Sequence, residues 1–234
     1  MILSAGKGTR LGKITETTPK VLVDINGKSL LRRAVETCVA HGFDDIIINV
    51  HHFADMVEEE IRRLKRLGFR ITVSDERNEL LDTGGGLYKA RDFFDRETFL
   101  LYNADIITDF NLLELLDYHR YKGGLATLSV RHRPGNRYLL VNEEGLLCGW
   151  CNNLTGERII ARGNDEKLSE IAFSSMHIID PEIFSYMSDG IYSMTPLYLR
   201  LASTHKIYTL LSDSGYWFNT GTPEILEEVR KFVR

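Results

Sequence analysis

The sequence is poor in cysteine, contains no long apolar run and has no excess of basic residues. Only 3 of its 234 residues are cysteine, a sparse and odd set consistent with reduced thiols in a cytoplasm. Cys148 and Cys151 form a C-x-x-C pattern. Neither further zinc ligands nor a redox-type strand and helix accompany it, so both thiols are interpreted as buried small residues. These observations predict a cytoplasmic protein.

The absence of long apolar runs excludes a class of membrane proteins. No stretch of about 18 apolar residues occurs, so no membrane-spanning helix and no membrane partner is predicted. The apolar residues Met1 to Ser4 are followed at once by Gly6, Lys7 and Gly8, which is unlike a signal peptide. Either the chain starts here, or a few natural residues precede Met1.

The charge balance argues against a nucleic-acid partner. The formal net charge is −4, and no basic arm, aromatic-plus-basic patch or recognition helix is evident. A site for an anionic substrate must therefore be built locally. Monomer and homodimer both remain open.

Strand and helix patterns alternate through the first half of the chain. Because such alternation is typical of parallel strands covered by helices, we predict a Rossmann-like α/β fold with a mixed, mostly parallel sheet. The expected strands are 1–4, 45–50, 69–74 and 98–103, and the expected helices are 29–41, 53–67 and 86–94. In the second of these helices, Met56, Ile61 and Leu64 are expected to face inward. Ligands in such sheets bind at the carboxyl ends of the strands, which marks residues 5–12 and 103–109.

Shorter strands joined by turns fill the second half. The expected strands are 124–131, 137–142, 145–150, 157–160, 171–179, 208–211 and 216–220, and the expected helices are 181–187, 196–204 and 223–232. No linker or internal repeat separates the halves. We therefore predict one domain, residues 1–234.

The segment Leu3-Ser-Ala-Gly-Lys-Gly-Thr-Arg10 is the strongest chemical signal. Small residues let the backbone approach a phosphate, and their N–H groups can point into one concavity. A dinucleotide fingerprint would need a third glycine at position 11, where Leu stands, and the spacing of a P-loop is also absent. A flexible turn would explain the two glycines alone, but further motifs follow.

Three further motifs could belong to the same site. Pro19-Lys20 follows at short range, although one lysine by itself is usually solvated surface. Asp82-Thr-Gly-Gly-Gly86 is expected to precede a helix and to let a flat base lie against backbone. Asp105 follows a buried strand, where a carboxylate suits Mg²⁺ beside substrate phosphates. Asp105 could instead cap the helix after Phe110, but Asp109 is better placed for that role.

Together the motifs LSAGKGTRL, TPKVL, DTGGG, NADI and YWFNTGTPE resemble the sugar-1-phosphate nucleotidylyltransferases, in order from Ile2 to Glu227. The short members that use N-acetylmuramate-1-phosphate with UTP, or mannose-1-phosphate with GTP, are the most similar. The resemblance implies a transferase of NDP-sugar and cell-wall biosynthesis that uses an NTP and a sugar-1-phosphate.

The resemblance also implies roles for individual residues. The catalytic residues would be Arg10, Lys20 and Asp105. Residues 1–123 would mainly bind the nucleotide, and residues 124–234 would mainly bind the sugar and complete the metal site. The implied nucleotide ligands are Ala5, Gly6, Gly8, Thr9, Arg10, Lys20, Gly84 and Gly85. Asn103 and Ser175 would contact the sugar, and Asp105 and Asn219 would bind Mg²⁺.

Two departures from the family pattern leave alternatives open. Asn219 stands where relatives carry a metal-binding Asp, and Ser174-Ser175 stand where they commonly carry glycine. A nucleotide-sugar-binding or regulatory protein that has lost turnover is therefore the alternative to an active enzyme. A nicotinamide oxidoreductase is a third hypothesis, against which Leu11 argues.

Overall fold

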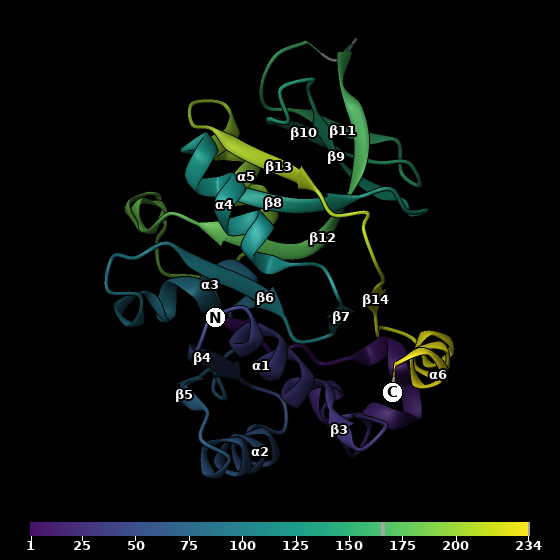
Figure 1. Ribbon diagram of the computed structural model, residues 1–234. Coiled ribbons are helices and arrows are strands. Elements are labelled where there is room, and N and C mark those ends of the chain that lie inside the picture. Colours follow the sequence, from purple (N-terminus) through teal and green to yellow (C-terminus); the bar gives the residue numbers. More distant parts are fainter. Residues whose placement is uncertain (165–166, 234) are drawn as a thin grey trace.

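The computed structural model describes residues 1–164 and 167–233, so the predicted domain 1–234 includes three residues outside the described ones. Its centre is a mixed sheet of ten strands with the order β11-β10-β9-β12-β6-β1-β4-β5, to which β8 adds beside β12 and β13 beside β8. This is the predicted α/β architecture of one domain (Figure 1).

The first half contributes the parallel part of the sheet, β6-β1-β4-β5. Short, β-branched strands such as Ile46–Ile48 are buried because helices cover both faces. The elements are β1 (Ile2–Leu3), the 3₁₀ helices η1 (Thr9–Thr15) and η2 (Lys20–Leu22), β2 (Asp24–Ile25), β3 (Lys28–Ser29), α1 (Leu30–Ala40), β4 (Asp45–Val50), α2 (Ala54–Arg66), β5 (Arg70–Asp75), α3 (Asp82–Lys89), η3 (Arg91–Phe93), β6 (Phe99–Asn103), β7 (Ile106–Thr108) and α4 (Leu112–Lys122).

The second half extends the sheet mainly with antiparallel pairs, joined by turns as predicted. One parallel pair, β13 with β8, lies at its border. The elements are β8 (Ala126–Arg131), β9 (Arg137–Val141), β10 (Leu147–Asn152), β11 (Glu157–Ile160), β12 (Ser169–Ile179), the 3₁₀ helix η5 (Pro181–Tyr186), α5 (Met194–Ala202), β13 (Ile207–Leu211), β14 (Trp217–Asn219) and α6 (Pro223–Phe232).

The core forms two main layers, one on each face of the sheet. Alternate residues of a strand point to opposite faces, so Ile47 packs with α3 and α5 whereas Ile46 and Ile48 pack with α1, α2 and α4. The three cysteines are buried and free, as expected. No helix in the described part of the chain is long and apolar enough to span a membrane.

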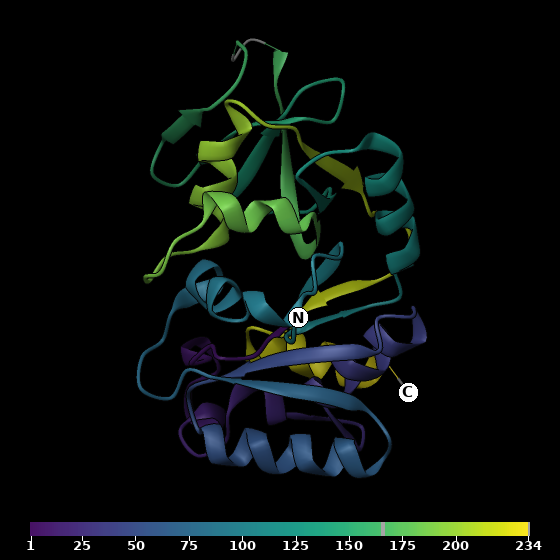
Figure 2. The same ribbon diagram turned by 90° about the vertical axis from the view of Figure 1, so that its left-hand side faces the viewer.

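The last helix leaves the second half and returns to the first (Figures 1 and 2). Leu226 and Val229 of α6 pack with Leu11, Ile25 and Leu30. The side-chain amide of Asn26 also donates to the carbonyls of residues 230 and 233. The segment behind the glycine-rich loop is therefore partly built from the C-terminal end of the chain.

Two local predictions about helices were wrong. Met56 of α2 is 41% exposed and Val57 is buried instead, because Val57 lies four residues before Ile61, on the same face of the helix, whereas Met56 lies five residues before it. Asn111, not Asp109, caps α4 by accepting the N–H of Leu113. Asp109 accepts the N–H of Tyr216, at 2.7 Å.

Candidate active site

The strand ends marked from the sequence line one cleft of about 450 Å³. Ser4, Ala5 and Gly6 enter it after β1, and Asn103 and Asp105 enter it after β6. β1 and β6 are neighbours in parallel register, with Leu3 opposite Asn103, so their carboxyl ends open on the same side. The cleft is completed by Lys20, Val21, Asn49, Leu80, Asp82, Thr83 and Ile191.

Gly8 brings the glycine-rich loop against Lys20. Its backbone is left-handed, with φ of 65°, and a Cβ there would lie 2.8 Å from the Cβ of Lys20. Both the conformation and the contact require glycine. A Cβ at Gly6, in contrast, would meet nothing within 4 Å, so the backbone there is open to a ligand. The two glycines thus have separate tasks, one in closing the loop and one in leaving room.

Lys20 forms an ion pair with Asp105 inside the cleft. Lys20 is only 7% exposed, and burial of this kind needs a partner charge. The backbone of Asp105 is fixed as well, because both the N–H and the hydroxyl of Thr220 donate to its carbonyl, at 2.9 Å each. The structure therefore brings together the predicted Lys20 and Asp105.

Two oxygens at this point have no partner in the described structure. Asp105 Oδ1 and Asn103 Oδ1 are buried and accept no hydrogen bond. A buried acceptor without a donor is costly, and a carboxylate oxygen beside an amide oxygen is a suitable donor set for a hard divalent cation. Among the described residues no group of three or more His, Cys, Asp or Glu could hold a metal, so phosphate oxygens would have to complete the coordination.

Arg10 and Asn219 line a second pocket of about 430 Å³. A Cβ at Gly221 would lie 2.7 Å from Arg10 Nη2 and 2.8 Å from Asn219 Oδ1, so both side chains reach the same glycine. Asn219 is linked to Asp105 through the next residue, Thr220. The exposed Thr9 precedes Arg10 at the start of η1.

The triple glycine was expected to precede a helix and border a base, but it lies inside α3. Gly84, Gly85 and Gly86 are all buried. A Cβ at Gly84 would lie 2.5 Å from the Tyr192 ring, and one at Gly85 would strike the carbonyl of Gly190. Tyr192 O accepts the N–H of Gly84 at 2.8 Å. The glycines make room for the chain itself, and Asp82 and Thr83 are the residues of this motif in the cleft.

A buried network supports the floor of the cleft. Asn49 Oδ1 accepts the N–H of Ser4 at 2.7 Å, and Asn49 Nδ2 donates to Glu76 Oε1 at 2.8 Å. Glu76 is 1% exposed, and this burial raises the pKa of its carboxyl although Asn49 and the N–H of Leu81 donate to it. The network ties the loop after β1 to the segment before α3.

Ser175 lies in a bulge of β12, where the register with β8 shifts between Phe173 and His177. Its φ of 63° is the left-handed conformation that glycine adopts most easily. Its neighbour Met176 pairs with Tyr102, which directly precedes Asn103. Ser175 and Asn103 are therefore both adjacent to the last pair of that ladder.

Sequence reasoning missed Asn49, Glu76, Thr220, Leu80 and Thr83. Asn49 and Glu76 stood at strand ends beside the marked edge, which is the one signal that could have indicated them. Thr220 gave no signal, because its role depends on β14 pairing with β7.

Comparison with known proteins agrees with this geometry. The sequence model described as "Nucleotidyl transferase" matches residues 1–234. The chain is 29% identical to an N-acetylmuramate alpha-1-phosphate uridylyltransferase of Caulobacter vibrioides, over 96% of this chain and 92% of that protein. It is 34% identical to a UTP–glucose-1-phosphate uridylyltransferase of Synechocystis, over 81% of this chain but 51% of that protein.

Solved structures share the fold. HddC from Yersinia pseudotuberculosis superimposes with a TM-score of 0.80 at 20% identity, covering 100% of this chain and 98% of that one. With strand ends, glycine loop and matched sequence in agreement, the chain belongs to the nucleotidyl transferase family.

Proposed function

We propose that this protein joins a nucleoside triphosphate to a sugar-1-phosphate, forming an NDP-sugar and releasing pyrophosphate. The observation that carries the proposal is the cleft in which an open glycine loop, a buried lysine and the Asp105 carboxylate meet at the carboxyl edge of the sheet. The two named relatives, both uridylyltransferases of sugar phosphates, support it.

In this proposal the first half, residues 1–123, binds the nucleotide, with Ala5, Gly6, Gly8 and Thr9 at the phosphates. Arg10 faces the charge that grows on the departing pyrophosphate, and Lys20 neutralises a phosphate oxygen. Residues 124–234 complete the sugar and metal sites. Because Gly84 and Gly85 are covered by residues 190–192, they would support the base only through Asp82 and Thr83. Asn103 and Ser175 are the proposed sugar contacts.

The residues present fit a divalent cation, which we propose to be Mg²⁺. Asp105 would hold it through its oxygen that has no partner, with Asn103 Oδ1 as the other such oxygen of the cleft. Asn219, which is joined to Asp105 through Thr220, would add a further neutral oxygen. The cation would neutralise phosphate charge and polarise the α-phosphate.

The chemistry demands positioning rather than proton transfer. The attacking phosphate oxygen is already anionic near neutral pH, so no general base is required. The barrier lies in bringing two polyanions together in line, and fixed cations and N–H groups lower it. Lys20 suits this task, because the ion pair with Asp105 and the close approach of the Gly8 backbone hold its side chain in one place.

Pyrophosphate release tests the proposal. The protein is incubated with Mg²⁺, each of UTP, GTP, CTP and dTTP, and a panel of sugar-1-phosphates including those of N-acetylmuramate, glucose and mannose. We expect release with one preferred pair, with UTP or GTP as the nucleotide. Release with no pair would overturn it. Nucleotide binding without release would instead support the alternative, a binding or regulatory protein impaired at Asn219. The protein is further proposed to act in the cytoplasm as a monomer or homodimer.

A further inference from the structure

Two arginines of the second half flank one tryptophan. The guanidinium carbon of Arg133 lies 5.0 Å from the ring centroid of Trp217, and that of Arg131 lies 5.7 Å from it. The ring is fixed, because its Nε1 donates to the carbonyl of Ser174 at 3.0 Å. Cation–π contacts of this kind orient a guanidinium but leave its N–H groups free to bind an anion.

The N–H groups of both arginines are incompletely used. Arg131 Nη1 and Arg133 Nε are buried and have no partner among the described residues. Arg133 donates to the carbonyls of Pro134 and Phe173, at 3.4 and 3.2 Å. The nearby Asp213 is bound by His132, at 2.9 Å to the backbone N–H and 2.6 Å to Nδ1. Neither arginine forms an ion pair within 4.0 Å among the described residues, and Asp213, whose carboxylate interacts with the charge of Arg131, is held by His132.

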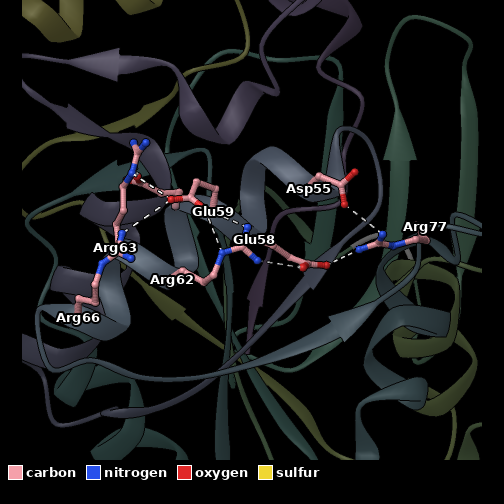
Figure 3. Close-up of polar contacts among 8 residues, drawn as sticks. Asp55, Glu58, Glu59, Arg62, Arg63, Arg66 and Arg77 are labelled. Atoms are coloured by element: carbon pink, nitrogen blue, oxygen red, sulfur yellow. Dashed lines mark hydrogen bonds and ion pairs between the residues drawn. The ribbon is translucent and has the colours of Figure 1, made fainter.

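The arginines on and beside α2 form the opposite case (Figure 3). Arg62 lies 3.0 Å from Glu59, and Arg77 lies 3.1 Å from Asp55 and also pairs with Glu58. These residues are exposed, where an ion pair contributes little. Arg62 and Arg77 thus have carboxylate partners at the surface, whereas the partly buried Arg131 and Arg133 form no ion pair among the described residues, although burial makes an unpaired charge costlier.

Arg133 opens into the pocket that also contains Arg10 and Asn219. Trp217 and Gly221 form its wall, and Glu228 of α6 is the acidic side chain lining it. Burial lowers the pKa of Arg133, and the charge of Arg131 adds to this effect. An anion placed in the pocket would relieve the repulsion and could accept from Arg133. Arg131 does not line the pocket but lies against its Trp217 wall, so it would contribute through its charge.

We propose that Arg133 and Arg10 bind a phosphoryl group of a substrate, with the charge of Arg131 beside them. The planar fork of Arg133 suits bidentate contact with phosphate oxygens. Two sources share this chemistry, the sugar-1-phosphate and the terminal phosphates of the triphosphate. The assignment to a substrate rests on the proposed function, whereas the anion site itself does not.

Binding and kinetics of R133Q, R131Q and R133K test the site, with R120Q on the exposed surface of α4 as the matched control. Calorimetry measures binding of inorganic pyrophosphate to the protein without other substrates. We expect R133Q to weaken it about tenfold or more, since it removes a charge-assisted hydrogen bond, and R131Q to weaken it less, since it removes only a nearby charge. R133K should lie between, because it keeps the charge but loses the fork.

Initial rates then distinguish the sources. A rise of KM for the sugar-1-phosphate alone identifies that substrate, and a rise of KM for the nucleotide identifies the triphosphate. Unchanged pyrophosphate binding and unchanged KM values in folded R133Q and R133K would overturn the site. If no substrate pair reacts but pyrophosphate binding still depends on Arg133, the proposed function fails and the anion site stands.

Discussion

The two halves of the sheet each bury an ionisable side chain, and they use it differently. Glu76, after β5 in the first half, accepts hydrogen bonds that hold the floor of the cleft. His177, on β12 in the second half, bonds the hydroxyl of Tyr198 at 2.8 Å and packs edge-on against Phe173. Glu76 of the first half thus supports the site, whereas His177 of the second half is a partner within the core.

Glu76 and His177 are also predicted to give the free energy of unfolding opposite dependences on pH. Burial raises the pKa of Glu76 above 4.5, so the native state holds a proton that the unfolded state releases, and stability falls as pH rises above about 4.5. Burial lowers the pKa of His177 from 6.5 to about 3, so stability falls as pH drops below about 6.5. Between about pH 4.5 and 6.5 the two contributions oppose each other.

The largest loss of activity is expected from the two proposed metal ligands, one from each half. Asp105→Ala removes a charge from the first half and should lower kcat/KM about 10²–10³-fold. Asn219→Ala removes a neutral oxygen from the second half and should cost about tenfold. Steady-state rates against Mg²⁺ concentration measure both, and Asn219→Asp should lower the Mg²⁺ concentration needed for half-maximal rate. Equal losses of kcat/KM in the two alanine variants would contradict the proposal that Asp105 contributes more to metal binding than Asn219.

Removing Glu76 tests whether the first half's buried acid serves the cleft. Glu76→Ala leaves the donors of Asn49 and Leu81 unmet and should destabilise the fold by about 1–3 kcal/mol. The KM for the nucleotide should rise as well, because Asn49, which holds Ser4 in the cleft, loses its partner. Denaturant unfolding at several pH values gives the stability, and Glu76→Gln should remove the decline above pH 4.5. If the variant is destabilised but its KM is unchanged, the network supports the fold and not nucleotide binding.

Lowering the pH should destabilise the fold through His177 in the second half. Lowering the pH from 6.5 to 4.5 should cost on the order of 2 kcal/mol through His177, since the unfolded chain takes up a proton that the native state refuses. His177→Gln, which keeps a partner for the Tyr198 hydroxyl, should flatten this slope in urea unfolding. A slope that persists in His177→Gln would assign it to other groups, such as His119, whose pKa burial also lowers.

The smallest effect concerns the bulge at Ser175. Ser175→Gly should stabilise the protein by up to about 1 kcal/mol, since relief of the left-handed conformation exceeds the added chain entropy. Ser175→Ala, which keeps the strain, is the control. Thermal unfolding measures both variants. If glycine and alanine shift the melting temperature equally, the hydroxyl rather than the backbone matters there.

The regular elements of both halves could be predicted well, because the spacing of apolar residues reflects which side chains are buried. β4 and α6 have the predicted bounds, and the strand-end rule located the cleft through Asp105 and the loop after β1. Roles set by tertiary contacts could not be inferred. The glycines of α3 looked like a ligand surface because Tyr192 lies about a hundred residues away. Nothing in the sequence indicated Arg131 and Arg133, because Trp217, against which both lie, is far from them along the chain.

The return of α6 to the first half bears on synthesis at the ribosome. Leu226 and Val229 cover Leu11, Val23 and Ile25, and Thr220 fixes the backbone of Asp105. A nascent chain that ends before residue 220 can pair its first strands but lacks the backing of its phosphate loop. Affinity for nucleotide should therefore arise only after the residues from Thr220 to Val229 have been synthesised and have folded back onto the first half.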